Sequence, residues 1–205
     1  MNGPRGALIF DYDGVLADTE PLHWKSWAKM LAVYGIDFTW NDYGIHGLGV
    51  SDAQMCVSIP KAWPHIDATE LLSRNAERKQ LVCALSLAEL PIPEETIALL
   101  ARLNEYRIGL VTSSERACVE PVLRACKLFE RFDALVFGED VAKPKPSPEP
   151  YLLIRQRLGI SAGIVFEDSD HGVRSALAAG LKVVKVGNPH DLAKIVCWSV
   201  NLARV

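Results

Sequence analysis

The chain has 205 residues, of which 49% are hydrophobic and 23% are charged, and its formal net charge at pH 7 is −3. This composition is typical of a soluble globular protein, and the length suits one α/β domain with an insertion or two small domains. The charge gives no reason to expect nucleic acid or an anionic membrane as a partner. No apolar run approaches the ~18 residues that span a bilayer, so we expect no membrane-spanning segment.

The N-terminus and the cysteines bear on where the protein works. The N-terminal residues lack the apolar segment and the cleavage site of a signal peptide. The five cysteines are scattered and form no Cys-x-x-Cys pair, which indicates reduced thiols rather than a disulfide framework or a zinc site. They are Cys56, Cys83, Cys118, Cys126 and Cys197. We therefore expect a cytoplasmic protein.

The first predicted element is a short apolar strand, Ala7–Phe10, which runs directly into Asp11, Asp13 and Gly14. Carboxylates at the end of a buried strand need a compensating charge, which a bound cation would provide. Ligands of open α/β sheets bind at this end of the strands. Asp11 and Asp13 could both face Mg²⁺, and one could attack phosphorus while the other handles the proton. The alternative is a strand end with an ordinary Asx-turn.

The chain from the first strand to residue 90 is mostly helical in character. A helix is predicted over Thr19–Tyr34, because apolar residues recur at helical spacing, and a long one over Thr69–Leu87. Between them, Asn41–Gly44 is predicted to form a turn. An insertion of roughly 70 residues is too long for the crossover of a plain βαβ unit. We therefore expect a separate helical cap domain over residues 17–90, with the core domain formed by residues 1–16 and 91–205.

Four basic residues of this insertion are candidate ligand-binding groups. They are His23, His46, Arg78 and Lys79. On sequence alone His23 is as well explained as a partly exposed surface histidine. The other three are more simply interpreted as solvated residues, and Arg78 in particular is expected on a solvated helix face.

Beyond residue 90, helices and apolar strands alternate. Helices are expected at 94–105, 116–129, 151–158 and 171–180, and strands at 107–111, 134–138, 163–166 and 181–186. The expected fold is therefore α/β, a Rossmann-like doubly wound parallel sheet with an inserted α-helical cap.

Polar residues follow three of these elements. Thr112, Ser113 and Ser114 come after a strand, where hydroxyls and free amides suit an oxyanion, although an ordinary helix N-cap explains them as well. The stretch 142–150 is rich in lysine and proline, which by itself indicates a rigid linker. Glu167 and Asp168 form a second acidic pair at a strand end. Two such pairs, with hydroxyls and a lysine between them, make coincidence a poor explanation.

Together these stretches resemble the four motifs of the haloacid dehalogenase superfamily, in its phosphatase and β-phosphoglucomutase-like branch. The matching sequences are DYDGVLADTEP, TSS, KPSP leading to a tyrosine, and FEDSDHGVRSALAAG. The resemblance implies that Asp11 is the nucleophile and Asp13 the general acid and base. It also implies that Thr112, the Ser113 amide and Ser114 hold the phosphoryl oxygens.

The remaining roles are also implied by the resemblance. Lys145, rather than Lys143 in the competing register, would supply a fixed positive charge. His23, followed four residues later by Trp27, and Lys79 would contact the substrate from the cap. Mg²⁺ is the implied cofactor. Its implied ligands are Asp11, the backbone carbonyl of Asp13, Asp168 and, beside it, Glu167.

The expected activity is Mg²⁺-dependent hydrolysis of a small phosphomonoester, by default a sugar phosphate, through an aspartyl-phosphate. The alternative is a β-phosphoglucomutase-type mutase, but Asp52 stands where mutases carry an arginine and would repel a second phosphate. Asp13 argues against a haloacid dehalogenase or a phosphonate hydrolase, and the length and the cap argue against a phospho-receiver module. We expect a small phosphorylated substrate as the partner, no nucleic acid or membrane, and a monomer or weak dimer.

Overall fold

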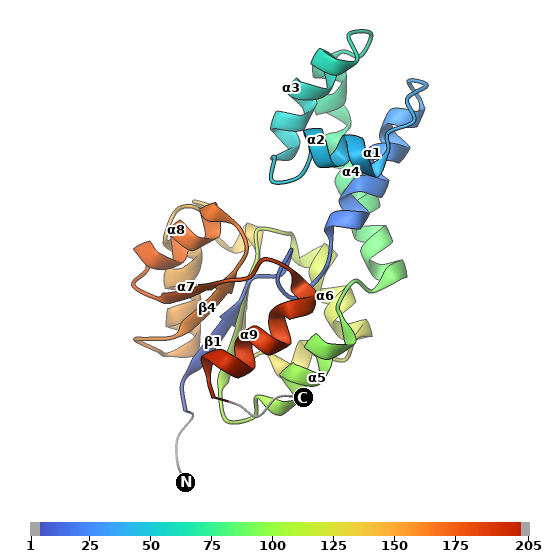
Figure 1. Cartoon of the computed structure of the whole chain (residues 1–205). Coiled ribbons are helices and arrows are strands. Elements are labelled where there is room, and N and C mark those ends of the chain that lie inside the picture. The colour runs from blue at the N-terminus through green and yellow to red at the C-terminus, as the bar shows by residue number, and fades with distance from the viewer. Residues whose placement is uncertain (1–4, 202–205) are drawn as a thin grey trace. The chain divides into compact units, whose positions relative to one another are not determined.

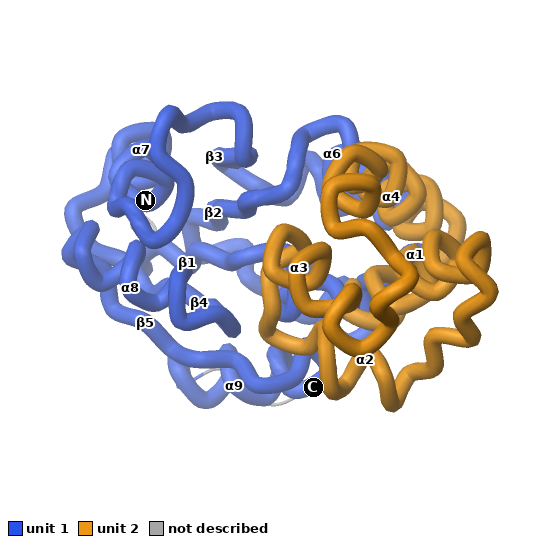
Figure 2. Tube along the Cα trace, turned by 90° about the horizontal axis from the view of Figure 1, so that it is seen from above, with its two compact units in different colours: residues 1–18, 90–205 blue, residues 19–89 orange. Residues whose placement is uncertain are grey.

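The computed structural model describes residues 5–201 and divides the chain into two compact units. Unit 1 consists of residues 1–18 and 90–205, and unit 2 of Thr19–Glu89 (Figure 2). Within residues 5–201, every helix is too short or too polar to cross a bilayer.

Unit 1 is built on a five-stranded sheet in which every pairing is parallel. Its strands, in chain order, are β1 (Ala7–Phe10), β2 (Arg107–Val111), β3 (Ala134–Val136), β4 (Ile164–Glu167) and β5 (Lys182–Lys185). Their spatial order is β3-β2-β1-β4-β5, so β1 is the central strand. The strand order reverses direction between β1 and β4, and in such sheets ligands bind at that point, outside the carboxyl ends of the strands.

Helices cover both faces of this sheet (Figure 1). They are α5 (Glu94–Arg102), α6 (Arg116–Ala125), α7 (Glu149–Leu158), α8 (Asp170–Ala178) and α9 (Leu192–Ser199). Alternate residues of β1 supply the two cores, because successive strand side chains point to opposite faces. Leu8 and Phe10 pack with residues of α5, α6 and α9, whereas Ala7 and Ile9 pack with residues of α7 and α8. The expected doubly wound α/β fold is confirmed.

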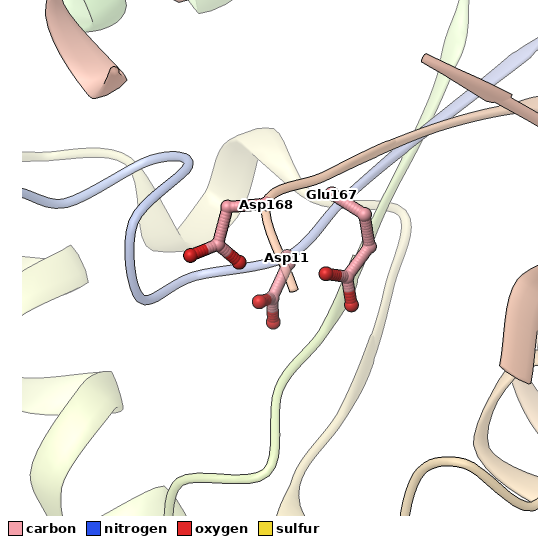
Figure 3. A group of neighbouring side chains, drawn as sticks. All are labelled: Asp11, Glu167 and Asp168. Carbon is pink, nitrogen blue, oxygen red and sulfur yellow. The ribbon is translucent and has the colours of Figure 1, made fainter. Parts of the chain in front are cut away.

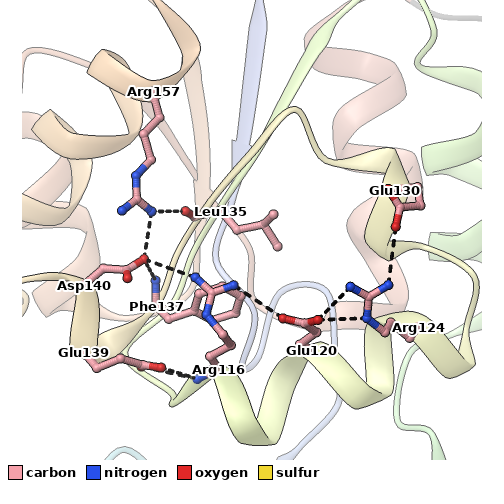
Figure 4. A network of polar contacts seen from close by, with 9 residues as sticks. All are labelled: Arg116, Glu120, Arg124, Glu130, Leu135, Phe137, Glu139, Asp140 and Arg157. Atoms are coloured by element: carbon pink, nitrogen blue, oxygen red, sulfur yellow. Dashed lines mark hydrogen bonds and ion pairs between the residues drawn. The ribbon is translucent and has the colours of Figure 1, made fainter.

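Short 3-10 helices lie in the loops of unit 1, at Phe129–Arg131, Gly138–Asp140 and Pro189–Asp191. Strand β3 ends at Val136, two residues earlier than the sequence predicts, because the 3-10 helix Gly138–Asp140 follows it. Asp140 stabilises this 3-10 helix, because its carboxylate accepts hydrogen bonds from the Phe137 amide at 3.1 Å and from Arg157 at 2.8 Å. Figure 4 shows how this network continues through Arg116 to further charged residues of α6. Burial alone would raise the pKa of Asp140, but its bonds to Arg157 and Phe137 outweigh burial and keep that pKa low.

Unit 2 consists of four helices, α1 (Glu20–Ala32), α2 (Trp40–His46), α3 (Asp52–Ala62) and α4 (Ala68–Glu89), around a core of its own. The turn predicted at Asn41–Gly44 is wrong, since these residues lie inside α2. A capping box explains the helix: the Thr39 side chain accepts from the Asp42 amide, and the Asp42 carboxylate accepts from the Thr39 amide.

Two further expectations need correction. Arg78 is 2% exposed rather than solvated, because α4 directs its side chain into the interior of unit 2. Cys56, Cys126 and Cys197 are free thiols, as expected, but Cys83 and Cys118 are not free. Spacing along the sequence identifies close cysteine pairs only, so it gave no sign of this difference.

Candidate active site

Acidic side chains from two neighbouring strands meet at the carboxyl end of the sheet. Asp11 follows β1, while Glu167 ends β4 and Asp168 follows it. β1 and β4 pair in register up to Phe10 and Phe166, so the next residues of both strands are neighbours. Each of the three carboxylates has an oxygen within 4.8 Å of an oxygen of the others, and Figure 3 shows them side by side.

The protein environment opposes the negative charge of this cluster. Burial, together with the charges of Glu167 and Asp13, raises the pKa of Asp11 well above its usual value, although Lys145 acts in the opposite direction. Burial and the charge of Glu167 raise the pKa of Asp168 to about 6. Such shifts show that the site needs more positive charge than Lys145 supplies.

The donor set fits a hard divalent cation. The three side chains offer only carboxylate oxygens, which Mg²⁺ prefers, and because burial raises the pKa of Asp11 and of Asp168, a bound cation would favour the charged forms that the protein alone disfavours. Gly14 supports the same arrangement. Its φ of +73° is left-handed, and a Cβ there would lie 2.3 Å from Oδ2 of Asp168, so only glycine lets this carboxylate approach the loop after β1.

Lys145 places its ammonium group between two carboxylates. Its Nζ donates to Oδ1 of Asp11 at 2.9 Å, to Oε1 of Glu167 at 2.7 Å and to the Val111 carbonyl at 3.1 Å. Burial alone would lower the pKa of Lys145, but the charges of Asp11 and Glu167 outweigh burial and raise it. The structure therefore brings a permanently charged Lys145 to the site, whereas Lys143 is exposed in the loop.

Glu167 is held by four protein donors. Lys145 and the Tyr151 hydroxyl donate to Oε1 at 2.7 and 3.0 Å, and the amide and hydroxyl of Ser169 donate to Oε2 at 3.1 Å each. These bonds occupy both oxygens, so Glu167 orients Lys145 more directly than it could bind a metal. The part of Tyr151 in this network was not predicted from the sequence. Its only signal was a tyrosine at the start of the helix after the lysine-proline stretch.

The hydroxyl segment after β2 contacts the loop after β1. Ser114 donates from Oγ to Oδ2 of Asp13 at 2.7 Å, and its amide donates to Oγ1 of Thr112 at 2.9 Å. Ser113 is exposed, and a Cβ on Gly138 would lie 2.3 Å from its carbonyl oxygen. The site therefore combines residues from the ends of β1, β2 and β4 and from the loop that carries Lys145.

The predicted cap residues lie in unit 2. His23 is half-buried near the start of α1, and Lys79 is exposed on α4. Asp52 is not free to act as an isolated negative charge, because it forms an ion pair with the buried Arg78. The expected repulsion of a second phosphate by Asp52 is correspondingly weaker than the sequence suggests.

The Mg²⁺ affinity of the site should depend on pH. A folded pKa of about 6 for Asp168 lies above the unfolded value near 3.9, so in metal-free protein this carboxyl destabilises the fold increasingly as pH rises from about 4 to 6. Mg²⁺ must displace the proton of Asp168, so this carboxyl alone should raise the Mg²⁺ affinity by up to about tenfold per pH unit below pH 6 and contribute no further rise above it; Asp11, whose pKa is also raised, adds a pH dependence of its own. Calorimetric titration with Mg²⁺ from pH 5 to 8 measures this.

The matched control for that titration is Asp168→Asn, which lacks the titrating carboxyl and should bind Mg²⁺ weakly with a flatter pH profile. Equal affinity of the unsubstituted protein at pH 5 and pH 7.5 would contradict the assignment of Asp168 as a ligand.

Comparisons with known proteins agree with this geometry. Residues 8–186 match the family described as haloacid dehalogenase-like hydrolase. The phosphorylated carbohydrates phosphatase of Thermotoga maritima is 34% identical over 189 residues, which cover 91% of this chain and 86% of that protein. The fructose-1-phosphate phosphatase YqaB of Escherichia coli is 33% identical over 185 residues, covering 87% and 95% of the two chains.

A solved structure extends the similarity to the fold. β-Phosphoglucomutase from Clostridium difficile superposes with a TM-score of 0.66 at 26% identity, covering 92% of this chain and 87% of that one. Strand order, the clustered carboxylates and the match over most of the chain all agree. This chain therefore belongs to the haloacid dehalogenase-like hydrolase family.

Proposed function

We propose that the protein is a Mg²⁺-dependent phosphatase that hydrolyses a small phosphorylated carbohydrate through an aspartyl-phosphate on Asp11. The main support for this proposal is that the two carboxylates after β1, Asp11 and Asp13, have different hydrogen-bond donors. Asp11 contacts the ammonium of Lys145, while Asp13 accepts from a hydroxyl of the β2 loop. One is placed beside positive charge, as a nucleophile for phosphorus requires, and the other beside a neutral donor, which suits proton transfer.

The chemistry follows from these positions. Asp11 attacks phosphorus, and Asp13 protonates the departing alcohol; Asp13 then removes a proton from the water that hydrolyses the aspartyl-phosphate. Lys145 offsets charge on the transferred group, and we assign Thr112, the Ser113 amide and Ser114 to hold its oxygens, on the strength of the motif resemblance. Mg²⁺, held by Asp11, the Asp13 carbonyl and Asp168, would supply further positive charge at the phosphoryl oxygens.

The names of the relatives support a carbohydrate substrate, since two of them are phosphatases of phosphorylated carbohydrates or of fructose 1-phosphate. We propose unit 2 as the cap that selects the substrate, with His23 and Lys79 as its contacts, on the strength of the motif resemblance. We propose that the enzyme works in the cytoplasm, where small phosphorylated metabolites occur. We also propose that it is a monomer or a weak dimer.

A mutase is the second candidate, because the fold is shared with a β-phosphoglucomutase. Asp52 still disfavours it, since a carboxylate cannot hold a second phosphate as an arginine would, although the ion pair with the buried Arg78 weakens its repulsion.

The proposal predicts phosphate release in a Mg²⁺-dependent screen of sugar phosphates and other phosphomonoesters. β-Glucose 1-phosphate with a bisphosphate primer is run in parallel to detect isomerisation, and chelation of Mg²⁺ with EDTA provides the blank. We expect release from at least one sugar phosphate at rates well above the EDTA blank, without isomerisation. Isomerisation of β-glucose 1-phosphate with little phosphate release would establish the mutase instead. Phosphorylation of the protein without turnover would establish a phospho-receiver module.

A further inference from the structure

The buried guanidinium of Arg78 is the centre of a polar cluster in unit 2. Its Nε donates to Oδ1 of Asn75 at 3.2 Å, its Nη1 donates to Oγ of Ser26 at 2.9 Å, and its Nη2 donates to the carboxylate of Asp52. The Arg78 side chain is fully buried, and its Cζ lies 4.9 Å from the centre of the Trp27 ring. A charge buried this deeply requires such partners, and a planar guanidinium can serve several of them at once.

The same guanidinium contacts His23. Nη1 of Arg78 lies 3.4 Å from Nδ1 of His23. Arginine has only N–H donors, so a hydrogen bond between these atoms requires Nδ1 to accept. A neutral imidazole that accepts at Nδ1 carries its proton on Nε2. The contact with Arg78 therefore selects one of the two tautomers of His23.

Ser26 connects the two residues a second time. It accepts from Nη1 of Arg78, and its Oγ donates to the carbonyl oxygen of His23 at 2.6 Å. The backbone and the ring of His23 are thus both tied to Arg78. Among the described residues of unit 2, Nε2 of His23 has no hydrogen-bond partner, which leaves this N–H for a group from outside that unit.

We propose that Arg78 is a positioning residue that holds His23 as the neutral tautomer with its proton on Nε2, so that His23 offers one N–H donor to an oxygen of the substrate. The role of His23 toward substrate rests on the proposed phosphatase function. The tautomer itself rests only on contacts within unit 2. Asp52 takes part by neutralising Arg78, which explains a carboxylate at this position without any contact between Asp52 and a ligand.

The tautomer is measured by long-range ¹H–¹⁵N correlation spectra of the ¹⁵N-labelled full chain at pH 8, without substrate. His23 is assigned from the signals lost in His23→Asn. We expect a protonated Nε2 and an unprotonated, hydrogen-bonded Nδ1. A proton on Nδ1, or fast exchange between the two tautomers, would overturn the proposal.

Arg78→Lys tests the positioning role. Lysine keeps the charge but cannot bridge Asp52, Ser26 and His23 in one plane. We expect a mixture of His23 tautomers and a fall in kcat/KM of about tenfold or more, which corresponds to one lost hydrogen bond to a charged group. If Arg78→Lys fails to fold, Ser26→Ala removes one of the two links and should shift the tautomer ratio in the same direction. An unchanged tautomer with unchanged kcat/KM in the folded variant would overturn the proposal.

A matched pair at His23 separates its two nitrogens. The amide of His23→Asn reaches the Nδ1 position only, and the longer side chain of His23→Gln reaches the Nε2 position. We expect His23→Gln to retain several-fold more kcat/KM than His23→Asn; the reverse order would contradict a donor at Nε2. Because the spectra need no turnover, an enzyme with the expected tautomer but no phosphatase activity would overturn the proposed function and leave the tautomer assignment intact.

Discussion

Asp11→Asn should abolish turnover and leave the fold intact. An amide of the same shape cannot attack phosphorus, so we expect kcat to fall by about 10⁴-fold or more, as for other lost nucleophiles. The backbone of β1 is unaffected by the change, because Phe10 stays paired and the amide of residue 11 still donates to the Phe166 carbonyl at 3.0 Å. Circular dichroism and Mg²⁺-dependent phosphate release measure the two halves of this prediction.

Two further variants make the test specific to the nucleophile. Asp13→Asn keeps Asp11 but removes both the acid for the departing alcohol and the base for water, so with a phosphoryl donor whose leaving group departs without a proton the covalent phosphoenzyme should accumulate and appear as an added phosphoryl mass in the rapidly denatured protein. Asp11→Asn should show no such mass. Asp191→Asn, at an exposed residue paired with Lys194, controls for the loss of a carboxylate and should keep full activity. Substantial activity in Asp11→Asn would show that another residue attacks phosphorus.

Gly172→Ala should destabilise the protein by about 3 kcal/mol, although the same change in an exposed helix is usually favourable by ~1 kcal/mol. Gly172 lies in α8 with an ordinary helical backbone, so alanine fits its conformation. A Cβ at this position would, however, lie 1.6 Å from Oε1 of Glu167, which is completely buried. Glu167 would have to move and abandon Lys145, Tyr151 and Ser169, and the activity should fall with the stability.

Gly187→Ala is the matched control. Gly187 follows β5 in the same unit, and a Cβ there would meet no atom within 4 Å. Its free energy of unfolding, measured by urea denaturation beside that of Gly172→Ala, should change by less than about 0.5 kcal/mol. A Gly172→Ala variant as stable as the unsubstituted protein would mean that the carboxylate of Glu167 is free to move away from α8.

The core of the site was predictable because each of its parts has a local signature. A short apolar strand followed by Asp11 and Asp13, and another followed by Asp168, place carboxylates at strand ends whatever the details of packing. Parallel pairing then brings those ends together at one edge of the sheet. Lys145 is different: its own surroundings indicate a linker, and only the family resemblance identified its role.

Other features depend on contacts that no local pattern encodes. The burial of Arg78 follows from partners on two other helices, including Ser26 of α1 and Asp52 of α3. Charged residues in helices are solvated so often that a buried one cannot be recognised from helical spacing alone. The role of Glu167 as an anchor for Lys145 depends similarly on the Tyr151 hydroxyl, which approaches from α7.

The central position of β1 has a consequence for synthesis of the chain. Its four residues are made before the other strands of the sheet and are entirely buried in the finished protein, yet they pair on one side with β2 and on the other with β4. At about 5–20 residues per second, a ribosome needs on the order of ten seconds to make the second partner. Until then one edge of an apolar strand is open to other chains, so the nascent protein should depend on chaperones until residue 167 has left the ribosome.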